Sequence, residues 1–425
     1  MRRILYIILD GLGDLPVPQL KESTPLETAF TPFMDRLARE GRCGLLYPVG
    51  EPVAPESDVA VISLLGYDAH KYYTGRGPLE AVGYGIDMQD GDLVFRGNFA
   101  TVADDGKRII DRRAGRNLTT HEASLLAQEI SQKIKLSNAD FIFKNTIGHR
   151  AILLIRSRQG KLSSWIGNTD PAYEREGLLS VALENFDHVV KDCKPLGGYE
   201  NDPACTKASE LTNEFTQKVF QILRESEVNR RRVNEGKLPA NIILLRDAGS
   251  HLPKFEPIKE RTGKKFACFV QMPVERGIAI LTGMEVIDLG EPQSLEEEYQ
   301  KWAKTALDSL DRYDGLYIHI KGPDEPGHDG DSLRKRQIIE MIDRYFFANL
   351  LPHIKKEEVV ICVTADHSTP CVLKSHSPDP VPLLIWARDL DKDDVKYFGE
   401  RFCKEGSLGT VKGPDLLSFL VKLAG

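Results

Sequence analysis

The sequence predicts an α/β fold: a mostly parallel sheet of the alkaline-phosphatase-like type with helices on both faces, plus an inserted smaller α/β domain. Near-continuous apolar runs of strand length, such as ILYIIL, GLYIHI and VVICVT, occur toward both ends of the chain. Segments with helical spacing separate these runs, which is typical of a parallel sheet covered on both faces. From about residue 80 the apolar runs become shorter and alternate with Gly and Asp turns, which indicates the insert.

The first part of the chain is predicted to alternate between strands and helices. The run ILYIIL is interpreted as a strand that ends at Asp10, because it is too short for a signal peptide and lacks a small-residue cleavage site. The segment TPLETAFTPFMDRLAREG follows with helical spacing and a terminal Gly. A strand is expected at GLLYPVG, and a helix is expected to begin just after the segment 55–57.

The middle of the chain is predicted to be a separate domain. It contains alternating runs such as LVFRGNFATV and RAILLIRS, and long polar helices at HEASLLAQEISQKI and SELTNEFTQKVFQILRES. From about residue 258 the buried-strand pattern returns with FACFVQM, GLYIHIKG, VVICVTADH and VPLLIWA. We therefore predict a discontinuous domain of residues 1–78 and 258–425, interrupted by a domain of residues 79–257.

Composition excludes several classes of function. The 425 residues are 41% hydrophobic and 28% charged, as expected of a soluble globular protein. A net charge of −7 gives no electrostatic basis for nucleic-acid binding, and no apolar run approaches the roughly 20 residues that span a bilayer. The seven cysteines have no paired spacing, which predicts a reducing, cytoplasmic location. The oligomeric state does not follow from the sequence.

Three long apolar runs end in residues of the types that bind metal ions. These residues are Asp10, Asp324 with His328, and the pair Asp366–His367, with His376 soon afterwards. In an open α/β sheet, ligands bind outside the carboxyl ends of the strands, so a parallel sheet would gather these side chains at one edge. Together with the Ser57 hydroxyl they exceed what one zinc or manganese ion needs. Two ions about 4 Å apart would use them all.

Each of these residues also has a purely structural interpretation. Asp10 and the pair Asp366–His367 could cap helices, Asp324-x-x-x-His328 could be a solvated turn, and His376 could be a surface histidine. Ser57, at the predicted start of a helix, could be an N-cap. A helix start also offers free N–H groups and a positive dipole end to an anion, and a serine near a divalent cation can act as a nucleophile.

The motifs ILDGLGD, PESDVA followed by LLGYD, GPDEPGHDGD, TADHSTP and HSPDPVP occur in the order found in the alkaline phosphatase superfamily. More narrowly, the sequence resembles the cofactor-independent phosphoglycerate mutases of archaeal type. The segments RGNFATV, DRRAGR, GHRAIL, NTDP and ANIILLR extend this resemblance over nearly the whole chain. The resemblance implies a metal-dependent phosphatase-like domain and an inserted transferase domain that faces it across a cleft.

The resemblance also implies two metal-ligand sets. One comprises Asp10, Ser57, Asp366 and His367, and the other comprises Asp324, His328 and His376. Ser57 would be the catalytic nucleophile and form a phosphoserine. The ions would be divalent, commonly manganese, with zinc, cobalt or magnesium as variants. The implied reaction interconverts 3-phosphoglycerate and 2-phosphoglycerate in glycolysis and gluconeogenesis, without bisphosphoglycerate as a cofactor.

Substrate binding is expected to use cationic side chains of the insert, since arginine forks suit carboxylate and phosphate groups. The candidates are Arg112, Arg113 and Arg116 of DRRAGR, His149 and Arg150 of GHRAIL, and Arg246 at a predicted strand end. A solvated basic loop is the alternative for DRRAGR. Asn98 and Asp170 are expected to orient the glycerate hydroxyls or to form Asx-turns. Arg276 stands where the family usually has Lys, and only Arg is a planar fork.

The sequence departs from the family pattern at two further positions, and it leaves two other functions open. The segment KGPDEPGHDG has an extra proline on each side of Asp324 and its neighbour, but it keeps the spacing from Asp324 to His328. A metal-dependent phosphatase or a phosphonate-cleaving enzyme of the same superfamily is the alternative enzyme. A non-catalytic metal-binding or interaction protein is the alternative from another class.

Overall fold

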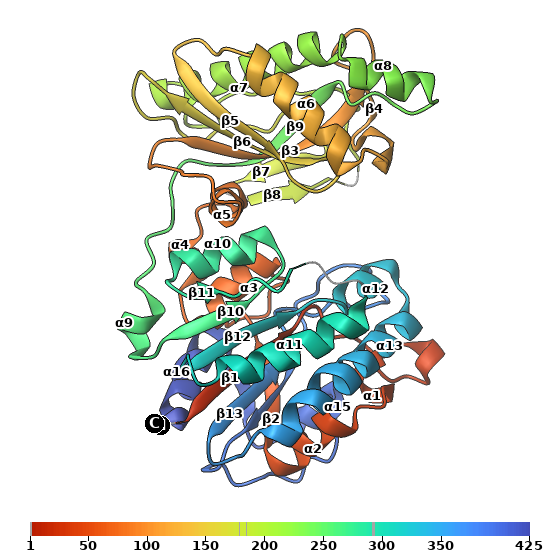
Figure 1. The fold of residues 1–425 in the computed structure, drawn as a ribbon, viewed down its shortest axis with the longest axis vertical. Helices are drawn as coiled ribbons and strands as arrows, with labels where there is room; N and C mark the ends of the chain where they lie inside the picture. The colour runs from red at the N-terminus through yellow and green to blue at the C-terminus, as the bar shows by residue number, and fades with distance from the viewer. Residues whose placement is uncertain (1, 178, 184, 291–293) are drawn as a thin grey trace. The chain divides into compact units, whose positions relative to one another are not determined.

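The computed structural model describes residues 2–177, 179–183, 185–290 and 294–425. Two compact units can be distinguished: unit 1 comprises Met1–Tyr73 and Lys254–Gly425, and unit 2 comprises Thr74–Pro253 (Figure 1). Both boundaries lie a few residues before those expected at 78/79 and 257/258. The functions assigned to the two units from the sequence stay predictions.

Within its described residues, unit 1 forms an eight-stranded sheet in the order β11-β10-β12-β1-β13-β14-β2-β15. The bounds are β1 Arg3–Leu9, β2 Arg42–Tyr47, β10 Phe266–Phe269, β11 Glu285–Val286, β12 Gly315–Ile320, β13 Val359–Thr364, β14 Val381–Trp386 and β15 Gly409–Lys412. Only β14 among these strands runs antiparallel to its neighbours. The predicted α/β class with a mostly parallel sheet is therefore confirmed, and β12, β1 and β13 end at the same edge.

Helices cover both faces of this sheet. They are α1 Pro25–Thr28, α2 Pro32–Glu40, α3 Ser57–Leu64, α4 Ala69–Tyr72, α9 Ile258–Thr262, α10 Pro273–Leu281, α11 Leu295–Ser309, α12 Asp324–Asp329, α13 Ser332–Ile342, α14 Ala348–Leu350, α15 Glu400–Lys404 and α16 Gly413–Ala424. On one face α16 packs against β1 and β13, and the Tyr6 hydroxyl donates to the carbonyl of Leu64 in α3. On the other, α11 covers the sheet (Figure 1), and its Trp302 packs edge-to-face on Phe269 of β10.

The segment expected as one helix at residues 24–41 forms two helices, α1 and α2. Pro32 is the first residue of α2, and Thr31 before it has φ −125° and ψ 59°, outside the helical region. A proline cannot continue a helix from the preceding turn and disfavours helical geometry in the residue before it, so the chain is interrupted here. The predicted end at Gly41 is correct.

Unit 2 contains an antiparallel sheet in the order β4-β3-β6-β5, with β9 also paired to β3, and a β7-β8 hairpin. The strands are β3 Leu93–Val102, β4 Ile109–Asp111, β5 Ala139–Asn145, β6 Arg150–Ser157, β7 Tyr173–Glu176, β8 Leu179–Ala182 and β9 Ile242–Gly249. The helices are α5 Arg76–Gly83, α6 Thr120–Lys133, α7 Pro203–Leu223 and α8 Glu227–Asn234.

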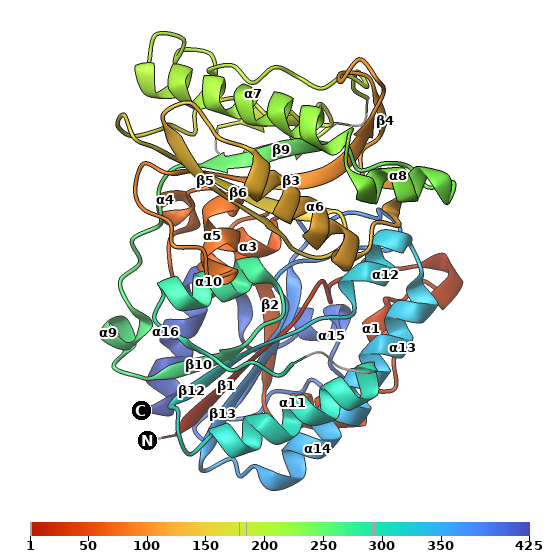
Figure 2. The ribbon, with the colours of Figure 1, turned by 45° about the horizontal axis from the view of Figure 1, so that its top comes forward.

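Alternation along β6 gives unit 2 an apolar core on each face of its sheet. Leu153 and Ile155 belong to the larger core, which also contains residues of α6 and α7. Ile152 and Leu154 belong to a smaller core with Ala81 of α5. Because successive side chains of a strand point to opposite faces, α6 and α7 cover one face and α5 the other (Figure 2).

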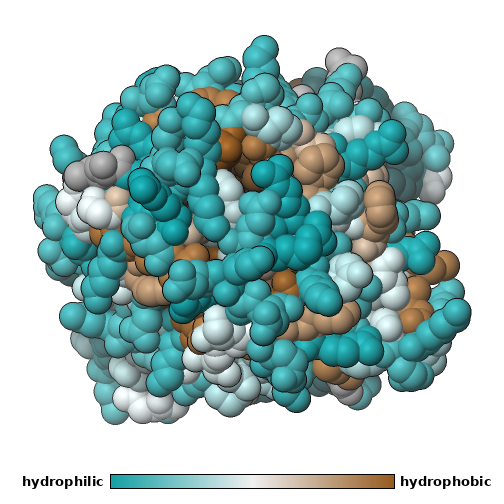
Figure 3. All heavy atoms as spheres, turned by 90° about the horizontal axis from the view of Figure 1, so that it is seen from below, coloured by the Kyte–Doolittle hydropathy of each residue, from teal (hydrophilic) through white to brown (hydrophobic). Residues whose placement is uncertain are grey.

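The surface view in Figure 3 is mostly hydrophilic, and its hydrophobic areas are small and separate. Isolated apolar side chains of this kind are normal on a protein surface. Within the described residues, no helix combines the length and the apolar character that crossing a membrane requires.

Candidate active site

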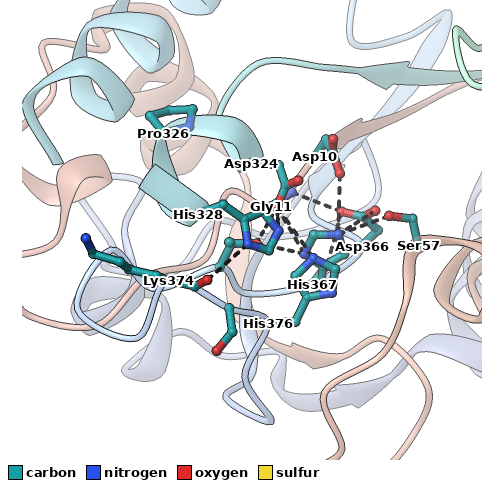
Figure 4. Close-up of polar contacts among 12 residues, drawn as sticks. Asp10, Gly11, Ser57, Asp324, Pro326, His328, Asp366, His367, Lys374 and His376 are labelled. Carbon is teal, nitrogen blue, oxygen red and sulfur yellow. Dashed lines mark hydrogen bonds and ion pairs between the residues drawn. The ribbon is translucent and has the colours of Figure 1, made fainter. Parts of the chain in front are cut away.

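The carboxyl ends of β1, β12 and β13 bring the predicted ligand residues together. Asp10 directly follows β1, and its N–H donates to the carbonyl of Ile320 at the end of β12, 2.9 Å away. The N–H of Gly11 donates to Oδ1 of Asp366, which lies just beyond β13, at 3.1 Å. No helix begins at Asp10 or Asp366, so the helix-cap interpretations of these residues are wrong. Figure 4 shows the side chains converging at this edge.

The first ligand group consists of Asp10, Ser57, Asp366 and His367. Nε2 of His367 lies 3.2 Å from the Ser57 Oγ, 3.4 Å from Asp10 Oδ1 and 3.2 Å from Asp366 Oδ2. Asp10, Asp366 and His367 are buried, and the two carboxylate oxygens named here have no hydrogen-bond partner in the described structure. Because a buried unpaired carboxylate oxygen is costly, this arrangement fits a bound cation.

Ser57 is the first residue of α3, and the extended residue Glu56 before it is the N-cap. The predicted helix start is confirmed, whereas the interpretation of Ser57 as the cap itself is wrong. The Ser57 Oγ instead points to His367. The apolar segment that follows, from Val59 to Leu64, buries α3 and thereby fixes the position of this hydroxyl.

The second ligand group consists of Asp324, His328 and His376. Asp324 and His328 lie four residues apart on α12, which places both on the same side of the helix, with Nε2 of His328 3.5 Å from Asp324 Oδ1. The turn interpretation of this motif is therefore wrong. Nε2 of His376 lies 3.6 Å from the same oxygen, so this side chain faces Asp324, and the alternative of a surface histidine is wrong.

Backbone carbonyls set the tautomers of the second group. Nδ1 of His328 lies 3.1 Å from the carbonyl oxygen of Lys374, and Nδ1 of His376 lies 2.8 Å from that of Pro55. A carbonyl oxygen only accepts hydrogen bonds, so each Nδ1 carries the proton and each Nε2 keeps its lone pair. Lys374 adopts the left-handed φ of 56° in presenting its carbonyl. Both lone pairs face Asp324, as metal ligands require.

His367 could belong to either group by distance alone, because its Nδ1 is 3.9 Å from Asp324 Oδ1. Thr369 resolves this ambiguity. Its hydroxyl donates to Asp324 Oδ1 at 2.7 Å and therefore accepts from Nδ1 of His367 at 2.9 Å. When the ring is neutral, as in a metal complex, Nε2 of His367 therefore carries the lone pair, and it faces Asp10 and Asp366. We therefore group His367 with these two carboxylates.

The electrostatics of both groups favour cations. Burial would lower the pKa of His367, but the charges of Asp366 and Asp10 raise it to about 10. Burial would raise the pKa of Asp324, but the nearby imidazole of His376 and the charge of His367 hold it well below its usual range. Surroundings that keep a proton on a buried imidazole and a carboxyl group ionised also attract divalent cations.

Four residues next to these groups were missed from the sequence: Glu275, His319, Lys321 and Thr369. His319 lies in β12 and Lys321 directly follows this strand. Because they are two residues apart, both side chains point to the same face of the sheet, the one covered by α3 and α10. Nε2 of His319 lies 3.4 Å from Asp366 Oδ2, and Nδ1 lies 3.2 Å from Oε1 of Glu275 in α10. The available signal was a titratable residue inside the otherwise apolar run GLYIHI.

In unit 2 the structure brings four predicted residues into contact. Nε and Nη2 of Arg112 donate to the two carboxylate oxygens of Asp170 at 2.9 and 2.7 Å, and Nη1 of Arg246 lies 3.5 Å from Asp170 Oδ2. With its amide oriented to satisfy both neighbours, Asn98 accepts from Nη1 of Arg246 at 3.0 Å. Asp170 also accepts from the N–H of Ala172 at 3.2 Å, so the expected Asx-turn is present.

Arg246 lies inside β9 rather than at the end of a strand, which corrects the expectation from the sequence. The motif DAG continues the strand because it pairs with β3: Leu245 lies opposite Gly97, and Gly249 lies opposite Val94. Arg246 also stacks over the ring of Tyr173, with 4.5 Å between the guanidinium carbon and the ring centroid.

The other arginines of unit 2 that were predicted to bind substrate lie near His149. Burial lowers the pKa of His149 to about 4, and the charges of Arg150, Arg113, Arg246 and Arg116 add to this effect. The imidazole is therefore neutral near pH 7, and the surrounding charge is strongly positive. Arg113 is half-buried, and Arg116 and Arg150 are exposed.

Arg276, which belongs to α10 of unit 1, is oriented differently from its neighbour Glu275. Its side chain is 42% exposed, and Nη1 lies 3.6 Å from Asp288 Oδ2. The preceding Glu275 is fully buried and faces His319 and Lys321. The contact with Asp288 neither supports nor contradicts a role of Arg276 in phosphate binding, which stays a prediction.

Comparison with known proteins gives consistent matches over the full length. The family model described as 2,3-bisphosphoglycerate-independent phosphoglycerate mutase matches residues 38–229. A protein of that name from Aeropyrum pernix is 44% identical, with 98% of this chain and 99% of the relative covered. Another from Methanopyrus kandleri is 41% identical, with 100% of this chain and 96% of the relative covered.

Solved structures agree with these matches. A protein from Pyrococcus horikoshii is 32% identical, with a TM-score of 0.81 over 100% of this chain and 97% of that one. The cofactor-independent phosphoglycerate mutase from Thermoplasma acidophilum is 33% identical, with a TM-score of 0.69 over 100% of both chains. The family resemblance inferred from the motifs is thereby confirmed: the chain belongs to the 2,3-bisphosphoglycerate-independent phosphoglycerate mutase family.

Proposed function

We propose that this chain interconverts 3-phosphoglycerate and 2-phosphoglycerate through a phosphoserine at Ser57, in cytoplasmic glycolysis and gluconeogenesis. The observation that carries the proposal is the position of the Ser57 hydroxyl, 3.2 Å from Nε2 of His367, within a group of buried carboxylates. The family membership supports the reaction, and this geometry supports the nucleophile.

The two ligand groups fit two divalent cations. Their donors are carboxylate oxygens, imidazole Nε2 atoms and one hydroxyl, a mixture that suits manganese, with zinc and cobalt as close alternatives and magnesium as a weaker one. The unpaired buried oxygens of Asp10 and Asp366 support this fit. Bound there, the cations supply Lewis acidity, which lowers the pKa of a neighbouring hydroxyl and offsets the charge of phosphoryl oxygens.

The chain itself orients the nucleophile. Ser57 begins α3, whose first turn has N–H groups without intrahelical acceptors and a partial positive charge toward an anion. The Ser57 oxygen attacks the phosphoryl group of 3-phosphoglycerate in line, the bond from phosphorus to the 3-oxygen breaks, and the proton lost by the serine is balanced by the one that the 3-oxygen takes up. Phosphoserine then transfers the phosphoryl group to the 2-hydroxyl of the same glycerate, which gives 2-phosphoglycerate and restores the serine hydroxyl.

We assign binding of the anionic glycerate to the arginines of unit 2. Asp170 is fully buried and holds Arg112 by two hydrogen bonds, so the guanidinium keeps a fixed orientation. In this proposal Asp170 positions Arg112 and Arg246, and Asn98 holds Arg246 in the same way. His149, neutral near pH 7, donates or accepts a hydrogen bond without adding to the positive charge.

An assay coupled to enolase, with 3-phosphoglycerate and manganese but no bisphosphoglycerate, tests the proposed reaction. We expect formation of 2-phosphoglycerate with little free phosphate. Release of phosphate without 2-phosphoglycerate would instead identify a phosphatase.

The nucleophile is tested by trapping labelled phosphate on the protein and locating it by mass spectrometry. We expect the label on Ser57, and Ser57→Ala should abolish both label and turnover. The matched control is Ser63→Ala in the same helix, where a buried hydroxyl without a hydrogen-bond partner is removed. Full turnover by Ser57→Ala would contradict the assignment.

A further inference from the structure

His319 is completely buried, and neither ring nitrogen has a hydrogen-bond partner among the described residues. A buried imidazole usually satisfies at least one nitrogen by a hydrogen bond, so these two atoms need an explanation. Its Nε2 instead faces the carboxylates of Asp10 and Asp366, both of which belong to the first ligand group.

The distances around Nε2 of His319 distinguish a hydrogen bond from shared binding of one metal ion. It lies 3.4 Å from Asp366 Oδ2 and 3.9 Å from Asp10 Oδ1. Hydrogen bonds from nitrogen to oxygen usually measure about 2.7–3.2 Å, so both distances are too long. Two ligands of one ion with bonds of about 2.1 Å lie between about 3 and about 4.2 Å apart. Both distances fall in that range.

The same two oxygens also face His367, whose Nε2 lies 3.4 Å from Asp10 Oδ1 and 3.2 Å from Asp366 Oδ2. The Nε2 atoms of both imidazoles therefore face the same pair of carboxylate oxygens. The ligand atoms of Asp10, His319 and Asp366 all lie within 4.8 Å of one another. A single cation between the oxygens can thus contact both rings.

Glu275 gives His319 the environment of a metal-bound histidine. Its Oε1 lies 3.2 Å from Nδ1 of His319, and although no hydrogen bond is formed between them, the negative charge favours the proton on Nδ1 and the lone pair on Nε2. Histidines that bind metal commonly have their second ring nitrogen directed at a carboxylate. Glu275 is fully buried, and so is this contact.

The charges match a divalent cation. The buried carboxylates of Asp10, Glu275 and Asp366 surround one ammonium group, that of Lys321, which lies 3.1 Å from Asp10 Oδ2 and 2.5 Å from Glu275 Oε1. With the imidazoles of His319 and His367 neutral, as metal binding requires, three negative charges against one positive charge leave an excess of two. A divalent cation bound by neutral imidazoles removes this excess, which would otherwise be costly in a buried site.

We infer that His319 is a fifth protein ligand of the cation bound by the first ligand group, and that Glu275 positions it. This inference rests on the proposed function, because it adds a ligand to the site proposed there. A second imidazole shifts the preference of this group toward manganese, cobalt and zinc and away from magnesium, which favours oxygen ligands.

Nitrogen-15 NMR of histidine-labelled wild-type protein, titrated with zinc, tests the inference without a variant. Four histidines should show Nε2 signals of metal-bound imidazole: His319, His328, His367 and His376. If only the three histidines other than His319 change, His319 is not a ligand, although the proposed function stands. If none of them changes and calorimetry detects no zinc binding, the proposed metal centre and this inference both fail.

Variants provide a second readout with cobalt. We expect His319→Gln to weaken one of the two binding events by at least ~10-fold and to intensify the visible cobalt bands, since fewer ligands then surround that ion. Glu275→Gln, which leaves His319 in place, should weaken the same event by about 10–100-fold. The matched control is His353→Gln, an exposed histidine of unit 1. Folded variants with wild-type affinity and spectrum would overturn the inference.

Discussion

Nδ1 of His367 donates a hydrogen bond to the hydroxyl of Thr369, 2.9 Å away. Because this hydroxyl donates in turn to Asp324 at 2.7 Å, it links the two ligand groups and fixes the tautomer of the histidine that faces Ser57. The segment from Asp366 to Thr369 therefore contains two proposed ligands, Asp366 and His367, and the hydroxyl that orients the histidine.

Thr369→Val should weaken metal binding and activity. Valine keeps the shape of threonine but removes the hydroxyl, so the Nδ1–H of His367 is left without an acceptor in a buried site. We expect metal affinity to fall by about 10–100-fold and stability by about 1–3 kcal/mol. Calorimetric titration with manganese and denaturation measure the two effects. Thr369→Ser retains the hydroxyl and should restore both, and equal defects in the Val and Ser variants would contradict the role of the hydrogen bond.

Gly11→Ala should displace Asp324. Gly11 has a φ of +61°, and an added Cβ would lie 2.7 Å from the Cβ of Asp324, too close for any packing without movement. We expect a loss of about 1–3 kcal/mol in stability from this overpacking. A displacement of about 1 Å at the ligand should lower kcat/KM by about 100-fold.

Gly263→Ala is the matched control for Gly11→Ala. Its φ is +69°, so the backbone strain is similar, but no atom lies within 4 Å of the added Cβ. This variant should lose stability without losing activity per folded molecule. If both alanine variants keep full activity, Gly11 is required only for its backbone conformation.

Asp170→Asn should raise the KM for 3-phosphoglycerate more than it lowers kcat. The asparagine cannot accept both hydrogen bonds of Arg112 or balance its charge, so the guanidinium loses its fixed orientation. Removing one partner of a buried ion pair costs about 3–5 kcal/mol of stability. Steady-state kinetics and denaturation measure both effects. The control is Asp140→Asn, whose exposed pair with Arg158 should contribute little to stability. An unchanged KM would show that Arg112 does not bind substrate.

The sequence predicts the strands and their ends well because each ligand-bearing strand is a continuous apolar run followed abruptly by charged residues. Asp10 and Asp366 stand out for this reason. His319 does not, because it lies within such a run, and its surroundings are contributed by Glu275, which is 44 positions away in sequence. A local pattern contains no information on such a contact. The number of side chains that converge at this edge of the sheet is therefore not predictable from spacing alone.

The insert was harder to predict for a different reason. Arginines that bind a ligand and arginines that pair within the protein have the same local sequence. Asp170 was expected to contact glycerate or form a turn, but its oxygens are occupied by Arg112 and the Asx-turn. Arg246 was expected at a strand end, whereas pairing with β3 extends the strand beyond it. Such partners become visible only when the sheet is formed.

Glu400 should make stability depend on pH. Burial raises the pKa of its carboxyl group to about 7; a hydrogen bond from Thr24 opposes this shift, and the negative charges of Glu27 and Asp14 add to it. Since the ordinary value is 4.5, the folded protein binds the proton more tightly than the unfolded chain. Stability is therefore fully retained below about pH 4.5 and decreases as the pH rises through about 7, by about 3 kcal/mol in total.

Glu400→Gln should remove this loss, because glutamine is neutral at every pH and preserves the contacts. Its amide oxygen can accept from the N–H of Asp14, as Oε1 does now at 3.1 Å. Its amide nitrogen can donate to the hydroxyl of Thr24, which now donates to Oε2 at 2.6 Å. Urea denaturation of both proteins at pH 5 and pH 8 measures the difference in stability. We expect the advantage of the variant to be larger at pH 8 than at pH 5 by about 2–3 kcal/mol. Glu405→Gln, an exposed glutamate at the end of the same helix, should show no such change. A difference that stays constant between the two pH values would mean that Glu400 ionises as readily in the folded protein as in the unfolded chain, and that the contacts with Asp14 and Thr24 offset its burial.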